Sequence, residues 1–230
     1  MRRMIGFLMM CGLFTIAVLP ELVFAQELTG KGVRVGLNRA SVSGLKGERA
    51  EIRRYNEGNS KFGFSVGGFL TYGLNEKFAI QPEIIYSIKI GEYYETYSGD
   101  DYDGEWKSEQ TETYKLSSID IPILFVFSVT ENVELLVGPF ASIIVDGRVE
   151  VEYASSYYDY QERYKVDLWE YTKSPEFGLV FGGAYSHGQF SVGARYSMGL
   201  TSVVNNYDDE VSDRLDIKVQ AIQLLGGYSF

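Results

Sequence analysis

The chain has 230 residues, a formal net charge of −10, and is rich in tyrosine (18), phenylalanine (14) and glycine (25). A chain this acidic would repel the phosphate backbone, which argues against nucleic acid as a partner. Its length suits one domain, and its aromatic and β-branched content favours strands over helices.

Residues 1–25 are typical of a secretory signal peptide. The segment opens with two arginines after the first methionine, continues with an apolar stretch, and ends on a small-residue cleavage site at Ala25. The apolar stretch is too short for a comfortable transmembrane helix. Cleavage leaves 26–230 as a single domain and removes Cys11, the only cysteine. The mature chain then has no disulfide, thiolate nucleophile or cysteine metal site.

Apolar residues recur at every second position in eight later segments, which is the period of a β-strand. These apolar stripes lie within 33–37, 62–72, 78–90, 119–129, 133–145, 177–185, 190–200 and 222–230. The connections between them alternate in length. Tight turns occupy 74–77, 130–132 and 187–189, and long polar segments occupy 39–61, 91–113, 146–175 and 202–214. Bacterial outer-membrane barrels show this alternation, with short turns toward the periplasm and long loops outside.

The second face of the predicted strands separates a membrane barrel from a soluble one. A soluble barrel of the lipocalin type shares the period of two but exposes lysine, glutamate and threonine to water. Here the second face is largely glycine, serine and alanine, which suits a narrow lumen filled by side chains. The sequence therefore predicts an all-β fold, an eight-stranded antiparallel up-and-down transmembrane β-barrel, located in the outer membrane.

Five short segments carry a resemblance to a known family. They are Gly32-Val-Arg-Val-Gly-Leu-Asn38, Phe78-Ala-Ile-Gln-Pro-Glu-Ile-Ile-Tyr86, Ile119-Asp-Ile-Pro-Ile-Leu124, Val137-Gly-Pro-Phe140 and Gly193-Ala-Arg-Tyr-Ser-Met-Gly-Leu200. In this order the chain resembles the PorT-like outer-membrane β-barrel family, which includes many small porin-family proteins, over roughly 32–230. The resemblance implies a small barrel in the outer membrane. Named members of that family are tied to secretion and gliding machinery, so an accessory role in secretion is one alternative.

Charged residues of both signs fall on the predicted lumen face. They are Arg34, Glu83, Lys89, Glu134, Arg195 and Lys218. In a narrow interior, such charges must pair to offset their desolvation. Two interpretations stay open: a salt-bridge plug that closes the lumen, and a narrow porin-like channel for small solutes or ions.

Two of the long polar segments combine acidic and aromatic residues. Segment 91–113 holds eight acidic residues against Lys107 alone, which predicts a solvated acidic loop, with calcium or divalent bridging to lipopolysaccharide as an alternative. Aromatic residues in these segments are typical of surfaces that contact an extracellular protein or glycan. The expected contact residues are Tyr94, Tyr102, Trp106, Tyr157 and Tyr158. Alternatively, the strands continue as hairpins above the bilayer and some of these rings form an aromatic girdle.

The last strand carries the expected assembly signal. Leu224, Tyr228 and Phe230 share one face and end the chain on an aromatic residue, which predicts capture by the barrel-assembly machinery through β-augmentation.

No catalytic chemistry is expected. His187, the only histidine, lies in a predicted periplasmic turn, so the sequence predicts no catalytic residue, cofactor or metal site. The predicted function is a small, non-enzymatic integral outer-membrane protein with a side-chain-filled lumen. Its expected partners are membrane lipid and lipopolysaccharide, the assembly machinery, and an extracellular protein or glycan.

Overall fold

The computed structural model describes residues 27–45, 53–101, 104–155, 160–167, 175–203 and 215–230. The predicted signal peptide, 1–25, lies outside these residues, as does most of the polar segment 202–214. The described residues form nine strands: β1 (Glu27–Leu45), β2 (Arg53–Gly73), β3 (Phe78–Asp101), β4 (Gly104–Ser128), β5 (Val133–Ser155), β6 (Tyr160–Asp167), β7 (Glu176–His187), β8 (Phe190–Gly199) and β9 (Leu215–Ser229). The described residues contain no helix that is long and apolar enough to cross a membrane.

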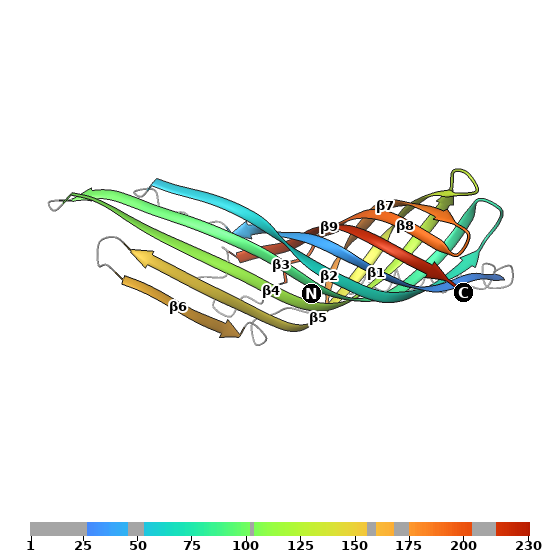
Figure 1. The fold of residues 1–230 in the computed structure, drawn as a ribbon, viewed down its shortest axis with the longest axis horizontal. Coiled ribbons are helices and arrows are strands. Elements are labelled where there is room, and N and C mark those ends of the chain that lie inside the picture. The colour runs from blue at the N-terminus through green and yellow to red at the C-terminus, as the bar shows by residue number, and fades with distance from the viewer. Residues whose placement is uncertain (1–26, 46–52, 102–103, 156–159, 168–174, 204–214) are drawn as a thin grey trace, which may run out of the picture.

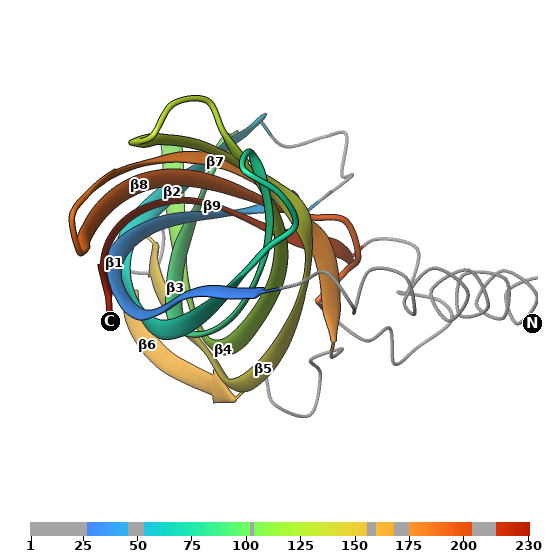
Figure 2. The same cartoon turned by 90° about the vertical axis from the view of Figure 1, so that its right-hand side faces the viewer.

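Eight of these strands close into a ring. Each strand of the ring pairs antiparallel with its neighbours, in the order β4-β3-β2-β1-β9-β8-β7-β5, and β5 returns to β4. The first and last strands meet along a long ladder that includes Val33↔Tyr228 and Leu37↔Leu224. Figure 2 shows the closed ring from one end. The predicted eight-stranded antiparallel up-and-down barrel is confirmed.

The ninth strand lies outside the ring. β6 pairs with the outer part of β5, from Arg148↔Asp167 to Ser155↔Tyr160, whereas the first part of β5 pairs with β7. The interpretation of 146–155 and 160–167 as a long polar loop is therefore wrong, and the alternative of strands that continue as a hairpin is confirmed there. The alternation of Val149 and Val151 with glutamates indicates this extension in the sequence.

The acidic segment 91–113 is also a strand hairpin. The β3–β4 ladder runs without a register shift from Gly91↔Tyr114 to Asp101↔Gly104. The prediction of a loop is wrong here, and the alternative of strands that continue as hairpins is confirmed. Backbone hydrogen bonding across the hairpin outweighs the weak strand preference of its many acidic residues.

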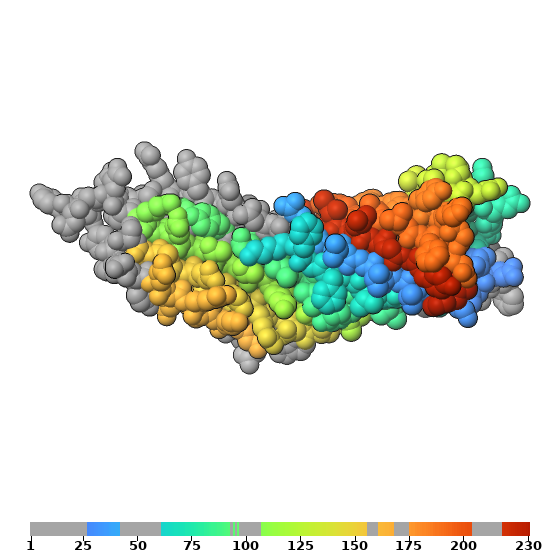
Figure 3. Space-filling model, in the orientation of Figure 1, coloured from blue at the N-terminus to red at the C-terminus, as the bar shows by residue number. Residues whose placement is uncertain are grey.

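A sheet thus projects from one end of the barrel. We define the projecting sheet as 53–60, 91–101, 104–114, 149–155 and 160–166, the outer parts of β2 to β6. Figure 1 shows these parts reaching well past the ends of β1, β7, β8 and β9. In the space-filling view, the green and yellow of β3 to β6 extend far beyond the blue and red of β1 and β9 (Figure 3). The opposite end, which we call the turn end, carries the tight turns.

An apolar band covers the outside of the barrel. Large apolar side chains are exposed at alternate positions of every strand in the ring, including Val35 (59%), Ile84 (64%) and Phe177 (53%). A continuous band of this kind is a liability in water but matches a bilayer. At the turn end, aromatic rings edge the band. Phe78 lies against Phe127 with ring centroids 5.1 Å apart, and Phe190 against Tyr228 at 5.3 Å.

Candidate functional site

One glutamate in the lumen is held between two arginines. Glu83 of β3 accepts two hydrogen bonds from Arg195 of β8, Nη1 to Oε2 at 2.6 Å and Nη2 to Oε1 at 2.9 Å. Arg34 of β1 places its Nη1 atom 2.9 Å from the same Oε1. Gln81, two residues before Glu83 and on the same face, also donates to this carboxylate. These four residues, all buried, form the Glu83 cluster.

The Glu83 cluster joins strands from three parts of the ring across the lumen. The carbon at the centre of the Arg34 guanidinium lies 4.3 Å from the centroid of the Phe69 ring, which gives the cation a second favourable contact. A carboxylate with bidentate and end-on arginine partners has most of its lone pairs occupied. The arrangement offsets the desolvation of the charges.

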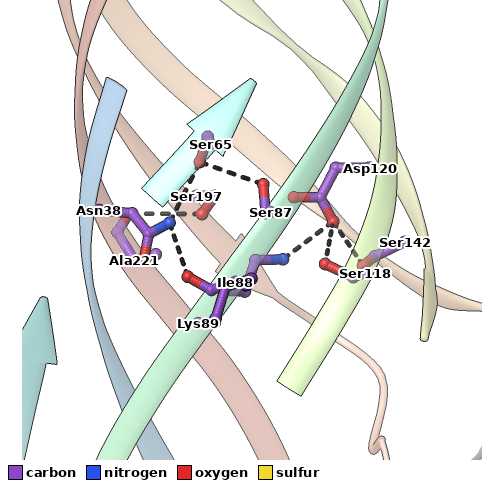
Figure 4. A network of polar contacts seen from close by, with 10 residues as sticks. All are labelled: Asn38, Ser65, Ser87, Ile88, Lys89, Ser118, Asp120, Ser142, Ser197 and Ala221. Atoms are coloured by element: carbon purple, nitrogen blue, oxygen red, sulfur yellow. Dashed lines mark hydrogen bonds and ion pairs between the residues drawn. The ribbon is translucent and has the colours of Figure 1, made fainter. Parts of the chain in front are cut away.

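A second polar group, the Asp120 cluster, lies nearer the projecting sheet, since its Lys89 is two residues from Gly91 on β3. Figure 4 shows its contacts. Asp120 Oδ1 accepts from Lys89 Nζ at 2.9 Å, Ser118 Oγ at 2.9 Å and Ser142 Oγ at 2.6 Å. Beside it, Asn38 Nδ2 donates to Ser65 Oγ at 3.1 Å and to the Ile88 carbonyl at 3.0 Å, and Ser65 contacts Ser87 at 3.2 Å. The lysine–aspartate pair is thus embedded in a network of short polar side chains.

Little space is left between the two clusters. Leu124, Phe140 and Val180 form a buried apolar group in the lumen. Next to it lies a cavity of about 20 Å³, bordered by both Lys89 and Arg195. A cavity of this size holds about one water molecule, so it offers no room for a solute.

The six residues predicted for the lumen do not all meet. Arg34, Glu83 and Arg195 come together, and Lys89 pairs with Asp120 instead. Glu134 is half-buried on the lumen side and within electrostatic range of Arg34.

The prediction that Lys218 lies on the lumen face is wrong. Lys218 shares the outward face of β9 with Ile222 and Leu224, because Val219 and Ala221 alternate with it and are buried. The sequence already indicates the outward face, because Lys218 is separated from Ile222 and Leu224 by an even number of positions.

Sequence reasoning also missed several lumen residues. Asp120 and Asn38 anchor the second cluster, yet neither was singled out. Asn38 follows Leu37, and Asp120 lies between Ile119 and Ile121; these neighbours belong to the apolar stripes, so both polar residues occupy the predicted lumen face. Their odd or even position along the strand is enough to assign both residues to the lumen face. Their partners could not be found in this way, because the contacts join strands distant in the sequence.

The inner face of the projecting sheet continues the lumen side of the barrel. Its described side chains include Tyr114, which donates to Glu112, and Gln110, whose Nε2 donates to the same carboxylate at 2.7 Å. On β5, Tyr153 donates to Ser108 Oγ at 3.1 Å, and Tyr164 of β6 is exposed. Aromatic rings beside hydrogen-bonded polar groups can contact both apolar and polar parts of a partner.

The outer face of the projecting sheet is charged, and its charges are largely paired. Arg163 contacts Glu150 at 3.0 Å and Glu152 at 3.2 Å, and Lys165 contacts Glu150 at 2.7 Å. Hydrogen bonds from Lys165 and Arg163 lower the pKa of Glu150 from its ordinary value. In the β3–β4 hairpin, hydrogen bonds from Lys107 and Tyr94 likewise lower the pKa of Glu109. Both carboxylates are therefore ionised at neutral pH.

The predicted contact residues fall at different places. Tyr94 is half-buried on the outer face of β3, beside Glu109. Trp106 lies in the β4 part of the hairpin, opposite Gly99. Tyr102, Tyr157 and Tyr158 lie outside the described residues.

The predicted assembly signal lies at the turn end. Leu224 and Phe230 are exposed on the apolar band, and the ring centroids of Phe230 and Tyr228 are 5.5 Å apart. The Phe230 backbone N–H donates to the Lys31 carbonyl at 2.9 Å, so the last residue is part of the β1–β9 seam.

His187 is exposed at the end of β7, in the turn that Gly188 closes with a positive φ of 59°. Within the described part of the chain, no group of three or more histidine, cysteine, aspartate and glutamate side chains is placed to hold a metal ion.

Comparison with known families and structures places this geometry in context. Residues 24–205 match the model of the outer membrane protein beta-barrel domain family. No curated protein gives a significant match. Among solved structures, the chain is similar to Ail, the attachment invasion locus protein of Yersinia pestis, in complex with the heparin analogue sucrose octasulfate. The identity is 16% over 87% of this chain and 98% of Ail, with a TM-score of 0.40.

Two further barrels are similar at comparable coverage. Neisserial surface protein A is 12% identical over 87% of this chain and 97% of its own, with a TM-score of 0.42. The N-terminal β-barrel domain of Pseudomonas aeruginosa OprF is 14% identical over 86% of this chain and 97% of its own, with a TM-score of 0.32.

Proposed function

Because the chain belongs to the outer membrane protein beta-barrel domain family, we propose that it is a non-enzymatic protein that contacts a partner outside the cell through its projecting sheet. The protein is located in the outer membrane. In such barrels the short turns face the periplasm, so the projecting sheet faces outward. The finer resemblance to PorT-like proteins, with its link to secretion, stays a prediction.

The extent of the projecting sheet carries this proposal. Four of its five segments, on β3 to β6, are joined by continuous antiparallel ladders well beyond the ends of β1, β7, β8 and β9. A barrel that only spans the bilayer needs strands of about 9–11 residues, whereas β3 and β4 have 24 and 25. The extra length presents an ordered surface to the outside.

The two faces of this sheet differ in what they offer a partner. On the outer face, carboxylates such as Glu150 and Glu109 are already matched by neighbouring basic side chains. The inner face offers Tyr153, Tyr164 and the Glu112 carboxylate. Tyrosine beside a carboxylate and amides suits a protein or glycan surface. We place the contact on the inner face.

The lumen supports a closed barrel over the alternative of a channel. The Glu83 and Asp120 clusters cross the interior, and the cavity bordered by residues of both clusters has room for about one water molecule. Planar-bilayer recordings of the refolded protein are expected to show no reproducible openings. Openings of constant conductance would favour the narrow channel instead.

Shortening the β3–β4 hairpin tests the contact surface directly. Gly91 and Tyr114 lie opposite each other, so replacing 92–113 with an Asn-Gly turn closes the hairpin at the same register. Vesicles that carry the native protein are expected to bind to glycan arrays or to intact bacterial cells, and vesicles with the shortened protein are expected to lose this binding.

The control for this experiment is barrel formation. Heat-modifiable gel mobility of the shortened protein is expected to match that of the native chain, because the ring residues are unchanged. Equal binding by the native and shortened proteins would overturn the proposal.

A further inference from the structure

Basic residues end the apolar stripes of five ring strands where the strands leave the apolar band. On four of these strands, the first charged side chain on the outward face beyond the band is a lysine or arginine. On β5, Asp146 precedes Arg148 on that face. The five basic residues, the basic belt, are Arg39 on β1, Lys61 on β2, Lys115 on β4, Arg148 on β5 and Lys218 on β9. On β3 the corresponding residue is Glu92, which pairs with Lys61.

Two members of the belt face each other directly. Lys115 and Arg148 are opposite in the β4–β5 ladder, and Ile90 separates Lys115 from Lys61 in the same row. Like charges directly opposite on neighbouring strands destabilise a sheet. Asp146 contacts Arg148 at 3.6 Å, and Asp167 lies opposite Arg148 on β6. Lys115 makes no ion pair with any described residue, so the unmatched positive charge at this point is that of Lys115.

The belt is specific to one end of the barrel. At the turn end, the exposed charged residues are mixed: Lys31 and Lys77 stand with Glu27, Glu76 and Glu131. The chain as a whole carries a net charge of −10. A predominantly basic row on an acidic protein therefore does not follow from composition. It marks the level at which anionic groups would meet the barrel.

We propose that the basic belt binds the phosphate groups of a phosphorylated glycolipid in the outer leaflet, with Lys115 and Arg148 as its centre. Neighbouring strands lie about 4.8 Å apart, so both side chains reach one phosphate. The apolar band directly below them contacts the acyl chains of the same lipid, as Val145 and Phe62 are exposed there. This inference depends on the outward orientation of the barrel and not on the role of the projecting sheet.

Titration of the refolded barrel in detergent with bis-phosphorylated lipid A tests this site. A ligand that binds only the folded state raises its unfolding temperature, which heat-modifiable gel mobility reports. Each basic residue near an anionic lipid surface contributes a factor of about five in affinity. The double variant Lys115→Gln/Arg148→Gln is therefore expected to bind about thirtyfold more weakly than the native protein.

Matched controls separate this site from general charge effects. The variant Lys31→Gln/Lys77→Gln removes two lysines at the turn end and is expected to bind lipid A like the native protein. Phosphate-free lipid A and inorganic phosphate are each expected to leave the unfolding temperature unchanged. Equal loss in both double variants would overturn the proposal. So would stabilisation by phosphate-free lipid A, or stabilisation by inorganic phosphate that matches that of the lipid.

Discussion

The lumen and the projecting sheet both pair arginine with glutamate, in opposite environments. Arg195 and Glu83 meet at 2.6 Å with side chains that are 1% and 0% exposed. Arg163 and Glu150 meet at 3.0 Å with side chains that are 62% and 34% exposed. The first pair is shielded from water and crosses the barrel, whereas the second links neighbouring strands on a solvated face.

The same strands change character where they leave the bilayer. Along β5, the outward face carries Val137 and Ile143 within the barrel and Arg148 and Glu150 beyond it. Toward the inside, β5 changes from Ser142 in the polar lumen to Val149 and Val151 in the sheet. Lipid demands apolar side chains on the outside of the barrel, and water allows charged ones on the outside of the sheet. The β4–β5 ladder has a register shift at this level, between Ser117 and Ser118, and the outward positions of β5 change there from odd to even residue numbers.

This contrast predicts that assembly depends on the ring and not on the sheet. Deleting Phe230 removes an aromatic residue that is 66% exposed on the apolar band and the backbone N–H that bonds to Lys31. We expect folded protein in the outer membrane to fall at least about tenfold, because an incomplete edge strand is poorly captured by β-augmentation. Membrane fractionation with heat-modifiable gel mobility measures this loss.

Phe190 provides a matched control for that deletion. It is 68% exposed on the same band and packs on the same Tyr228 ring, but it begins β8 and is not the terminal residue. The Phe190→Ser variant is expected to assemble nearly normally. Equal loss in both variants would show that the band needs aromatic area at the turn end, and would contradict a specific terminal signal.

The buried pair is expected to contribute far more to stability than the exposed one. Glu83→Leu leaves Arg34 and Arg195 without their carboxylate inside the lumen. Breaking a buried pair by removing one partner costs about 3–5 kcal/mol of unfolding free energy. Urea unfolding of the refolded barrel measures the change. Glu134→Leu is the control and should cost less, since Glu134 is only half-buried. A cost below about 1 kcal/mol for Glu83→Leu would show that the Glu83 cluster does not hold the ring together.

Gly199 in β8 tests how tightly the interior of the barrel is packed. A Cβ at Gly199 would lie 2.8 Å from the Val219 carbonyl oxygen and in collision with the buried Glu176 carboxylate. Overpacking of this kind costs about 1–3 kcal/mol, so Gly199→Ala should lower the urea midpoint. A Cβ at Gly68 meets only the Gly32 carbonyl oxygen, at 3.4 Å. Gly68→Ala is therefore expected to be nearly neutral, and a similar cost at both positions would contradict the packing argument.

The sequence was sufficient for the ring and insufficient for the sheet, for a physical reason. Within the bilayer, period two is strong, because lipid and lumen demand opposite residues, as in Ile84 beside Glu83. In the sheet, alternation persists on β5, where Val149 and Val151 are buried, but β6 has Val166 as its only aliphatic residue, so 160–167 reads as a loop. The lumen charges were predicted one strand at a time. Their pairing, such as that of Glu83 with Arg195, depends on ring closure, which spacing along the chain does not reveal.

The exposed Arg163–Glu150 pair should lose its stabilising contribution at a higher pH than that at which the barrel unfolds. We expect this effect to be smaller than those of the Phe230, Glu83 and Gly199 changes. Lys165 and Arg163 lower the pKa of Glu150 from its ordinary value of 4.5. This contribution to stability is therefore fully present above pH 4.5 and is lost as the pH falls through the lowered pKa of the folded state. Hydrogen exchange of β6 amides, corrected for the intrinsic pH dependence, is expected to accelerate below about pH 4 relative to that of β7 amides. Glu150→Gln removes the titrating group and should leave the β6-to-β7 ratio flat across the same pH range. If β6 and β7 instead lose protection together, the exposed pairs do not stabilise the projecting sheet separately from the barrel.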